Sequence, residues 1–454
     1  MKSNAWIPSI QDGKWDTYFQ KLYGADAVPA QRQRYVRAIR QFVQTFPEHA
    51  ESQISVFSAP GRTEIGGNHT DHQHGCVLAA AIQLDVVAVV SFRTDRKLRL
   101  QSEGYPMDTI DLSRLEAQPS EQGTSAALIR GIAAKLAQNG VQPSGFDAYT
   151  TSAVLTGSGL SSSAAFEILL GTIFNEHDND GAMTPVALAQ AGQYAENIYY
   201  GKQSGLMDQT ACASGGVVYV DFQDTTSPKV TAHAVDFARY GYAICITDTK
   251  GSHADLTDDY TAIPTEMRQV AAQFGQTELR GVSEEAFYAA IPQLRRSCSD
   301  RAILRAMHFF AENRRAGAQA QALESGDMAQ FLTLVQESGA SSAELLQNLY
   351  SASKPTAQEI PLAIAVSKRL LAGAGAVRVH GGGFAGTIQA FVTYCVGNPN
   401  RVQLRGQLFC TTARQMNIAA DILTAENDAG NIASGKSQRF LFVKLWIAVC
   451  RQPP

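Results

Sequence analysis

The segment Leu155-Thr-Gly-Ser-Gly-Leu-Ser-Ser-Ser-Ala164 sets two glycines and a run of three serines in front of an apolar helix. The glycines let the backbone come close to a ligand, and the free N–H groups of a helix N-terminus favour phosphate. Ser163 falls in the first helical turn, where its hydroxyl can reach a metal ion as well as a phosphate. The segment predicts a phosphate-binding loop; the competing interpretation is a serine-rich helix cap after a flexible turn.

A second glycine-rich segment, residues 59–75, reads APGRTEIGGNHTDHQHG and follows a short predicted strand at 55–59. Its polar side chains fall on one loop: Arg62, Asn68, His69 and Asp71. Several short donors and acceptors converging from a rigid loop are typical of a polyol site. The run HTDHQH at 69–74 also admits a zinc site, but its spacing fits no common zinc motif. We favour the polyol site.

A third segment, residues 201–209, reads GKQSGLMDQ and holds one carboxylate, Asp208. Upstream, Glu196 lies near the end of a helix that begins at Thr184-Pro185, a good N-cap and first-turn pair, and runs to about Tyr199. A lone loop aspartate and a helix glutamate are more often solvated than functional. On their own, these carboxylates identify no site.

Together, the three segments resemble the galactokinase branch of the GHMP kinases. GSGLSSSAA is similar to the GHMP phosphate loop, residues 59–75 to the galactokinase signature APGRxNxIGEHTDYxxG, and SGLMDQ to the CGIMDQ element. GGGFAG at 381–386 looks like the third GHMP motif, and the resemblance covers about residues 15–391. This sequence departs from the family pattern at Leu155 (proline in the family), Glu64 (asparagine), Asn68 (glutamate), His72 (tyrosine) and Ser204 (cysteine). The family's glutamate is a sugar ligand, so Asn68 is the departure that can change sugar preference.

The resemblance implies an α+β, two-domain GHMP kinase fold, with an N-terminal ribosomal-S5-domain-2-like part, a C-terminal ferredoxin-like part and the active site in the cleft between them. It implies ATP-dependent phosphorylation of galactose at the anomeric hydroxyl, giving α-D-galactose 1-phosphate, the Leloir step of galactose catabolism. The implied residues are, for catalysis, Asp208 and Arg62; for the substrate, Asn68, His69, Thr70, Asp71, Gly205 and Tyr260; for ATP, Ser102, Gly157, Ser158, Gly159, Leu160, Ser161, Ser162 and Ser163; and for Mg²⁺, Ser163 and Glu196.

A chain of 454 residues suits two domains, and strands mixed with helices without regular βαβ alternation favour the α+β class. We predict an N-terminal sugar- and phosphate-binding domain at 1–216 and a C-terminal GHMP kinase domain at 217–391, which begins with strands at 217–222 and 242–247. Helices are expected at about 300–316, 326–337 and 358–372, with a strand at 376–380.

The resemblance stops abruptly at the tail, residues 392–454, which carries 7 basic and 3 acidic side chains. We interpret the tail as a shifted reading frame or a replaced C-terminus. Either would leave the sheet of the second domain with an unpaired edge.

The bulk composition limits the classes of partner that the protein is expected to bind. A net charge of −4 gives no field for nucleic acid or an anionic membrane surface. No signal peptide or bilayer-length apolar stretch is present, and seven scattered cysteines without a CxxC pair indicate reduced thiols. We therefore expect a cytoplasmic protein without nucleic-acid or membrane partners. The resemblance implies galactose and ATP as the partners, and we expect a monomer.

Two further nucleotide motifs compete with this assignment. Residues 430–437 fit the P-loop pattern GxxxxGK[ST], but only 17 residues follow them and none is acidic, so we interpret the match as coincidence. Residues 381–386 fit GxGxxG, but the next acidic residue is Asp421, too distant for a dinucleotide fold. The remaining alternatives are a GHMP kinase for N-acetylgalactosamine, a uronic acid or mevalonate, and a non-catalytic sensor of sugar and ATP.

Overall fold

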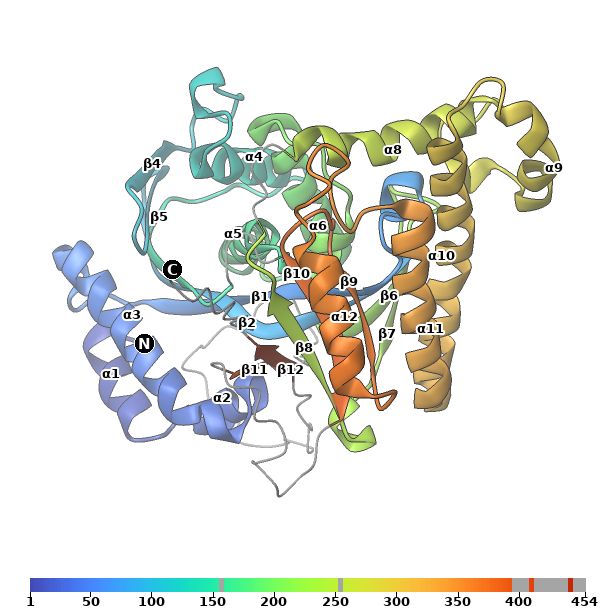
Figure 1. Cartoon of the computed structure of the whole chain (residues 1–454). Helices are drawn as coiled ribbons and strands as arrows, with labels where there is room; N and C mark the ends of the chain where they lie inside the picture. The colour runs from blue at the N-terminus through green and yellow to red at the C-terminus, as the bar shows by residue number, and fades with distance from the viewer. Residues whose placement is uncertain (155–158, 252–255, 394–407, 412–439, 444–454) are drawn as a thin grey trace, which may run out of the picture.

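The computed structural model describes residues 1–154, 159–251 and 256–393, together with the backbone of strands at 408–411 and 440–443 (Figure 1). The α-helices are α1 (Ser3–Gln11), α2 (Asp16–Tyr23), α3 (Val28–Thr45), α4 (Ser125–Gln138), α5 (Ser162–Asp178), α6 (Pro185–Tyr194), α7 (Met207–Ser214), α8 (Thr257–Ala272), α9 (Glu284–Leu294), α10 (Asp300–Ser325), α11 (Met328–Ser341) and α12 (Glu359–Leu371). The strands are β1 (Ser55–Gly66), β2 (Cys76–Phe92), β3 (Lys97–Ser102), β4 (Met107–Asp111), β5 (Phe146–Ser152), β6 (Val217–Asp221), β7 (Lys229–His233), β8 (Tyr242–Asp248), β9 (Ala376–His380), β10 (Thr387–Thr393), β11 (Leu408–Thr411) and β12 (Phe440–Val443). Short turns of π-helix, η5 (Ala195–Tyr200) and η8 (Ser342–Leu346), continue α6 and α11, and the remaining turns are 3-10: η1 (Ala25–Ala27), η2 (Pro47–His49), η3 (Asp71–Gln73), η4 (Pro119–Glu121), η6 (Phe237–Tyr240) and η7 (Leu279–Gly281).

The first seven strands form one sheet in the order β4-β3-β5-β2-β6-β7, with β1 paired to β2. The register between β1 and β2 shifts between Pro60 and Arg62 and again between Glu64 and Gly66. Such bulges bend a strand and re-aim its side chains. The strand predicted at 55–59 therefore continues to Gly66, and Arg62 and Glu64 belong to a strand, not to the loop in which the sequence prediction put them.

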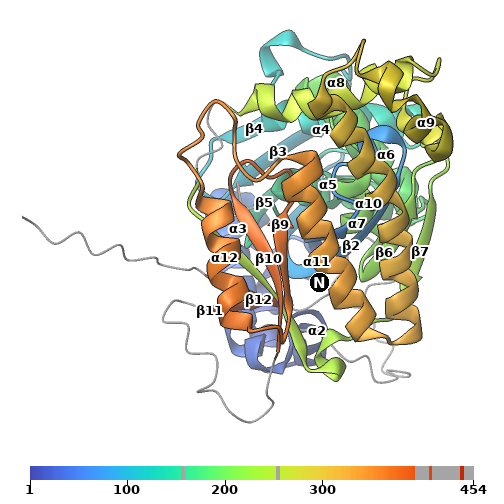
Figure 2. The ribbon, with the colours of Figure 1, turned by 45° about the vertical axis from the view of Figure 1, so that its right-hand side comes forward.

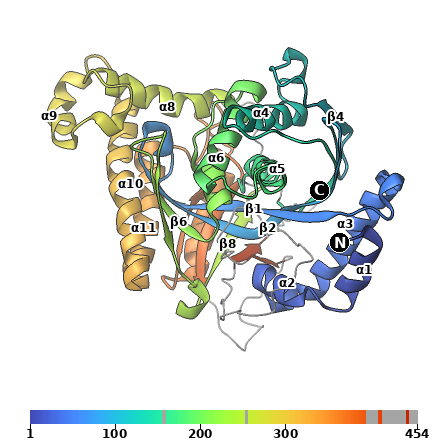
Figure 3. The ribbon, with the colours of Figure 1, turned by 180° about the vertical axis from the view of Figure 1, so that it is seen from behind.

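Both faces of this sheet are buried because apolar residues follow one another along β2. Val87 and Val89 pack on one side with an aromatic cluster from α1–α3, whereas Ala88 and Val90 pack on the other with α4 and α5. Successive side chains of a strand point to opposite faces, which explains this division. Figures 1 and 3 show α1–α3 on one side of β1 and β2, and α4–α6 on the other. Tyr35, Ile39 and Phe42 of α3 are buried in this aromatic cluster.

The strands β6 and β7 complete this sheet, because β6 pairs with β2 and β7 with β6. The predicted domain boundary at 216/217 falls before these two strands, whereas the chain leaves the first sheet only between His233 and Tyr242. Periodicity shows that β6 is a strand but says nothing about which strand it pairs with.

The second sheet has the order β11-β12-β8-β10-β9, and α12 covers the outer face of β9 and β10 (Figure 2). Strand β12 from the tail runs parallel to β8, with Phe440 opposite Ile244. The prediction of an unpaired edge is therefore wrong for β8, whose two neighbours are β10 and β12. The remaining residues of the tail, including the P-loop pattern at 430–437, lie outside the described residues.

One apolar core joins the two sheets. Ile244 and Ile246 of β8 and Phe391 of β10 belong to the same buried cluster as Ala88 and Val90 of β2. Phe331 of α11 lies in this cluster, with its ring centroid 5.0 Å from that of Phe391. The helices α10 and α11 stand side by side in Figures 1 and 2.

The predicted helices and the predicted strand at 376–380 are present, and α10 extends to Ser325, beyond the expected end near 316. In the part of the chain that the structure describes, no helix has the length and apolarity to span a bilayer. The described cysteines Cys76, Cys212, Cys245 and Cys298 are free thiols.

Candidate active site

A cavity of about 450 Å³ opens where β1, the start of α7 and α8 approach the turn between β9 and β10. Its walls come from segments far apart in sequence: Arg62, Glu64, Asn68, His69, Asp71, His72, Lys202, Gln203, Ser204, Gly205, Met207, Asp208, Tyr260, Thr261, Pro264, Thr265, Arg268, Gly381 and Gly382. The volume is within the range of small-molecule sites. The 59–75 and 201–209 segments both line the cavity, and the phosphate loop reaches it through the contact between Ser161 and Asp208.

Asp208 stands in the first turn of α7, where the N–H groups of the helix favour a negative charge. Arg62 holds its Oδ1 by two contacts, Nε at 2.8 Å and Nη2 at 2.7 Å. Ser161 of the phosphate loop donates to Oδ2. A third of the Asp208 side chain (33%) stays exposed, so that a ligand in the cavity can reach the carboxylate.

The surroundings of Asp208 keep it ionised. Burial acts to raise its pKa, but the charge of Arg62 and hydrogen bonds from Ser161 and Arg62 outweigh that effect and hold the pKa below the ordinary value. Arg62 itself is buried and also donates to the carbonyl of Gly159. The pair is therefore a fixed carboxylate beside a fixed cation, directly against the phosphate loop.

The described part of the phosphate loop, Gly159 to Ser163, leads into α5. Ser161 has a positive φ of 57°, which turns the chain into the helix, and the Arg62 amide donates to the Leu160 carbonyl at 3.1 Å. Leu160 is fully buried, so only its backbone can face a nucleotide. Gly157 and Ser158 lie outside the described residues. The predicted loop therefore sits at a helix N-terminus and against Asp208.

The predicted metal ligands lie together. Ser163 Oγ is 3.5 Å from Glu196 Oε1, and Lys202 Nζ is 2.6 Å from the same oxygen. A hydroxyl and a carboxylate beside a phosphate loop are the oxygen donors that Mg²⁺ accepts, so the residues fit the ion. Lys202 neutralises the carboxylate in this structure.

A second carboxylate, Glu167 of α5, lies behind Glu196 and was not predicted. The Gln209 amide donates to Glu167 at 2.9 Å and to Glu196 at 3.0 Å, which ties the two carboxylates together. Burial and the neighbouring Glu196 raise the pKa of Glu167 well above its ordinary value. Nothing in its helical sequence distinguishes Glu167 from other buried helix residues, so the sequence offered no signal for it.

The predicted sugar ligands divide into two groups. Asp71 and Gly205 meet across the cavity: a Cβ built on Gly205 would lie 1.9 Å from Asp71 Oδ2, so the absence of a side chain at 205 makes room for the carboxylate. Thr70 is buried and does not line the cavity, because its hydroxyl faces the backbone, 2.9 Å from the Gly67 carbonyl and 2.7 Å from the Cys76 carbonyl. Asp71 therefore faces the cavity, and Thr70 shapes the loop that carries it.

The remaining predicted sugar ligands contact the glycine turn 381–383. Asn68 Nδ2 donates to the Gly381 carbonyl at 2.8 Å, His69 Nε2 lies 3.0 Å from the Gly382 carbonyl, and Tyr260 Oη donates to the Gly383 carbonyl at 2.8 Å. Burial lowers the pKa of His69 to about 3, so the ring is neutral and Nε2 is the donor. The turn joins the antiparallel strands β9 and β10, which is incompatible with the dinucleotide-binding interpretation of GxGxxG.

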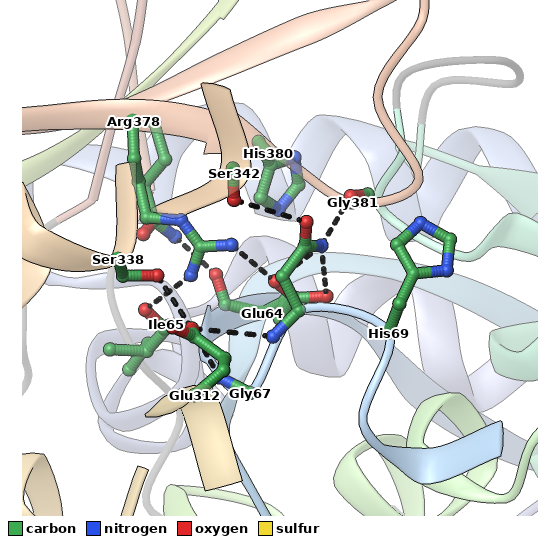
Figure 4. A network of polar contacts seen from close by, with 12 residues as sticks. Glu64, Ile65, Gly67, His69, Glu312, Ser338, Ser342, Arg378, His380 and Gly381 are labelled. Carbon is green, nitrogen blue, oxygen red and sulfur yellow. Dashed lines mark hydrogen bonds and ion pairs between the residues drawn. The ribbon is translucent and has the colours of Figure 1, made fainter. Parts of the chain in front are cut away.

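The most important residue that the sequence did not indicate is Arg378 of β9. It is fully buried, and its Nη2 lies 2.6 Å from Glu64 Oε1, also buried, in an ion pair between the two sheets (Figure 4). A single arginine within an apolar strand offers a weak signal, a charge that must find a partner.

Two other predicted features lie away from the cavity. Ser102 ends β3 and accepts a hydrogen bond from Thr150 at 2.9 Å; it does not line the cavity, and its contact with ATP stays a prediction. Within the described residues, one group of potential metal ligands is close enough to share an ion, namely Glu48, His49 and Asp147, and not the HTDHQH run. Arg93 and Arg99 already neutralise Asp147.

Comparison with known proteins gives a consistent result. The galactokinase galactose-binding signature matches residues 40–92, and the GHMP kinases N terminal domain matches residues 127–216. A galactokinase from Streptomyces coelicolor is 32% identical over 335 residues, which is 73% of this chain and 83% of that protein. The crystal structure of Lactococcus lactis galactokinase complexed with galactose superposes with a TM-score of 0.65 at 25% identity, over 78% of this chain and 89% of that one. Methanococcus jannaschii mevalonate kinase, at 13% identity, has a similar fold, with a TM-score of 0.52 over 75% of this chain and 92% of its own.

Proposed function

The chain belongs to the galactokinase family, and we propose that it transfers the γ-phosphoryl group of ATP to the anomeric hydroxyl of galactose, giving α-D-galactose 1-phosphate. Its α+β architecture is the GHMP kinase fold that the sequence predicts. One observation supports the proposal most: Asp208 contacts both Arg62, from the strand that precedes the sugar loop, and Ser161 of the phosphate loop. A sugar hydroxyl at Asp208 therefore lies beside the place where a nucleotide phosphate binds.

In this mechanism Asp208 accepts the proton of the anomeric hydroxyl, or orients that hydroxyl for in-line attack on the γ-phosphorus. Arg62 keeps Asp208 ionised and stabilises negative charge on the transferred group. The N–H groups at the start of α5 bind phosphate oxygens. Ser163 and Glu196 would hold Mg²⁺, which would supply positive charge to neutralise the phosphates of ATP. Asp71, Gly205 and the neighbouring loop orient the sugar.

The direct test is ADP release with a panel of sugars, namely galactose, N-acetylgalactosamine, galacturonate and mevalonate, each with ATP and Mg²⁺. We expect galactose to give the highest kcat/KM. Turnover of another compound in place of galactose would redirect the assignment to another GHMP kinase substrate. Binding of galactose and ATP without ADP release would indicate a sensor.

We expect Gly205→Ala to raise the galactose KM by at least about tenfold, since the new Cβ would collide with Asp71 and move a carboxylate that faces the sugar. The KM for ATP should change much less. Gly317→Ala is the matched control, because its Cβ would meet only the Tyr219 hydroxyl, at 3.7 Å. Steady-state kinetics with each substrate varied in turn measure both values. An unchanged galactose KM in Gly205→Ala would show that the sugar binds elsewhere.

We expect Glu196→Gln to raise the Mg²⁺ concentration for half-maximal activity by about tenfold or more, because an amide is a weaker ligand than a carboxylate for a hard cation. Removing the metal with EDTA should abolish turnover of the unmodified enzyme, and added Mg²⁺ should restore it. Glu324→Gln, an exposed helix position, is the control. An unaltered Mg²⁺ requirement in Glu196→Gln would exclude Glu196 as a ligand.

We also propose that the enzyme acts as a monomer in the cytoplasm, where ATP is available. The scattered cysteines of the sequence, four of which the structure describes as free, support a reducing compartment. Size-exclusion chromatography with light scattering measures the oligomeric state.

A further inference from the structure

The Asn68 side chain lines the cavity but has no hydrogen-bonding capacity left for a ligand. Its amide nitrogen donates to Glu64 Oε1 at 3.0 Å and to the Gly381 carbonyl at 2.8 Å. Its amide oxygen accepts from Asn348 Nδ2 at 2.9 Å and from Ser342 Oγ at 3.4 Å. A primary amide has two N–H donors and two acceptor lone pairs, so every position is used within the protein.

The backbone of Asn68 is fixed as well. His308 Nε2 lies 2.9 Å from the Asn68 carbonyl, and Glu312 Oε1 accepts from the Asn68 amide at 3.4 Å. Glu64, the neighbour of the Asn68 side chain, is itself held by Arg378. Asn68 is completely buried, so a sugar hydroxyl could bond to it only after one of these contacts had been broken.

These bonds connect Asn68 to the glycine turn 381–383. Asn348 donates to Asn68 and also to the Gly382 carbonyl, at 3.1 Å, so that the two asparagines fasten consecutive peptide groups of the turn. Gly381 and Gly383 have positive φ values, of 65° and 82°. Glycine reaches these angles without strain but is also the most flexible residue, so the turn depends on its hydrogen bonds to keep one conformation.

The ends of the glycine turn pack against the phosphate loop. A Cβ built on Gly159 would lie 3.3 Å from both His380 Nδ1 and Thr387 Oγ1, and one built on Gly381 would lie 3.9 Å from the Gly159 Cα. These are packing distances without intervening space. A displacement of the turn would therefore reach Gly159, which carries one of the carbonyls that Arg62 binds.

We propose that Asn68 is a positioning residue that fixes the glycine turn 381–383 against the phosphate loop, and that it is not a ligand of the sugar. This inference rests on the proposed function, because it concerns the same nucleotide and the same sugar. It assigns sugar recognition in this cavity to Asp71 and its neighbours, and it gives Asn68 a role in nucleotide affinity.

The test compares Asn68→Ala with Asn348→Ala in the full-length protein. Asn348 does not line the cavity but holds both Asn68 and the turn, so both variants should raise the KM and the Kd for ATP by about tenfold, as expected for loss of one or two buried hydrogen bonds. Ser342→Ala, which loses only the 3.4 Å contact, should stay within about twofold. Calorimetry with ATP and Mg²⁺ gives the Kd independently of turnover.

A series of monodeoxygalactoses separates positioning from direct contact. If Asn68 bound one sugar hydroxyl, Asn68→Ala would lose nothing further with the sugar that lacks it, whereas a positioning residue gives additive losses at every position. The inference would be overturned if the effect of Asn68→Ala disappeared with one particular deoxygalactose, or if Asn348→Ala left the ATP affinity unchanged. If thermal unfolding shows that Asn68→Ala is not folded, the ATP affinities of Asn348→Ala and Ser342→Ala test the positioning role instead. Failure of the unmodified enzyme to phosphorylate galactose would count against the proposed function, whereas the calorimetric ATP result still tests the positioning role.

Discussion

Asp208→Asn is expected to lower kcat by about three orders of magnitude while leaving the galactose Kd within about threefold. The amide keeps the size of the side chain and can still bond to a hydroxyl, but it cannot accept the proton from it. Arg62 also loses the charge that it neutralises. Single-turnover kinetics with ATP and Mg²⁺ measure the chemical step, and calorimetry measures the binding of galactose.

The control for this substitution is Asp224→Asn, at an exposed turn where the carboxylate accepts only from neighbouring residues. It should leave both kcat and the galactose Kd unchanged. If Asp208→Asn kept kcat within tenfold of the unmodified enzyme, Asp208 would not be the proton acceptor. A large rise in the galactose Kd would instead make it chiefly a binding residue.

Arg378→Met is expected to destabilise the protein by about 3–5 kcal/mol, since it removes one partner of a buried ion pair and leaves Glu64 with an uncompensated charge. For a protein of this size, that corresponds to a fall in Tm of about 3–5 °C. Scanning calorimetry gives Tm directly. Arg295→Met removes an exposed pair with Asp300, in which the side chains are 64% and 70% exposed, and should cost less than about 1 kcal/mol.

The loss of stability in Arg378→Met should depend on pH. Burial already raises the pKa of Glu64 against the opposing effect of Arg378, and removing the arginine raises it further. A carboxyl whose pKa is higher in the folded state than in the unfolded state binds more protons when folded, so stability falls as the pH rises above its unfolded value. The Tm difference from the unmodified protein should be smaller at pH 5 than at pH 8. Equal differences at both pH values would show that Glu64 does not carry the effect.

The chemistry of the site could be predicted from sequence wherever it lies within a short segment. The phosphate loop, the 59–75 segment and Asp208 each combine unusual residues at fixed spacing, and the structure brings Asp208, Arg62 and Ser161 into contact. Short segments are informative because glycines and helix N-termini constrain the local backbone.

The parts that could not be predicted depend on contacts between distant residues. Arg378 and Glu64 are separated by more than three hundred positions, and no pattern near either one names the other. The assignment of Asn68 as a sugar ligand rested on its place in a motif; the saturation of its amide depends on Asn348 and Gly381. In the same way, the sequence predicted a strand at 217–222 but could not show that its neighbour is β2.

The apolar cluster that contains Ile244, Phe391 and Ala88 has a thermodynamic consequence. Two domains with separate hydrophobic cores can unfold one after the other, whereas two sheets that share one core unfold together. Heat or denaturant should therefore melt both sheets in a single cooperative transition. Neither half should survive as an excised fragment, because the cut would expose the phenylalanines that now face the opposite sheet.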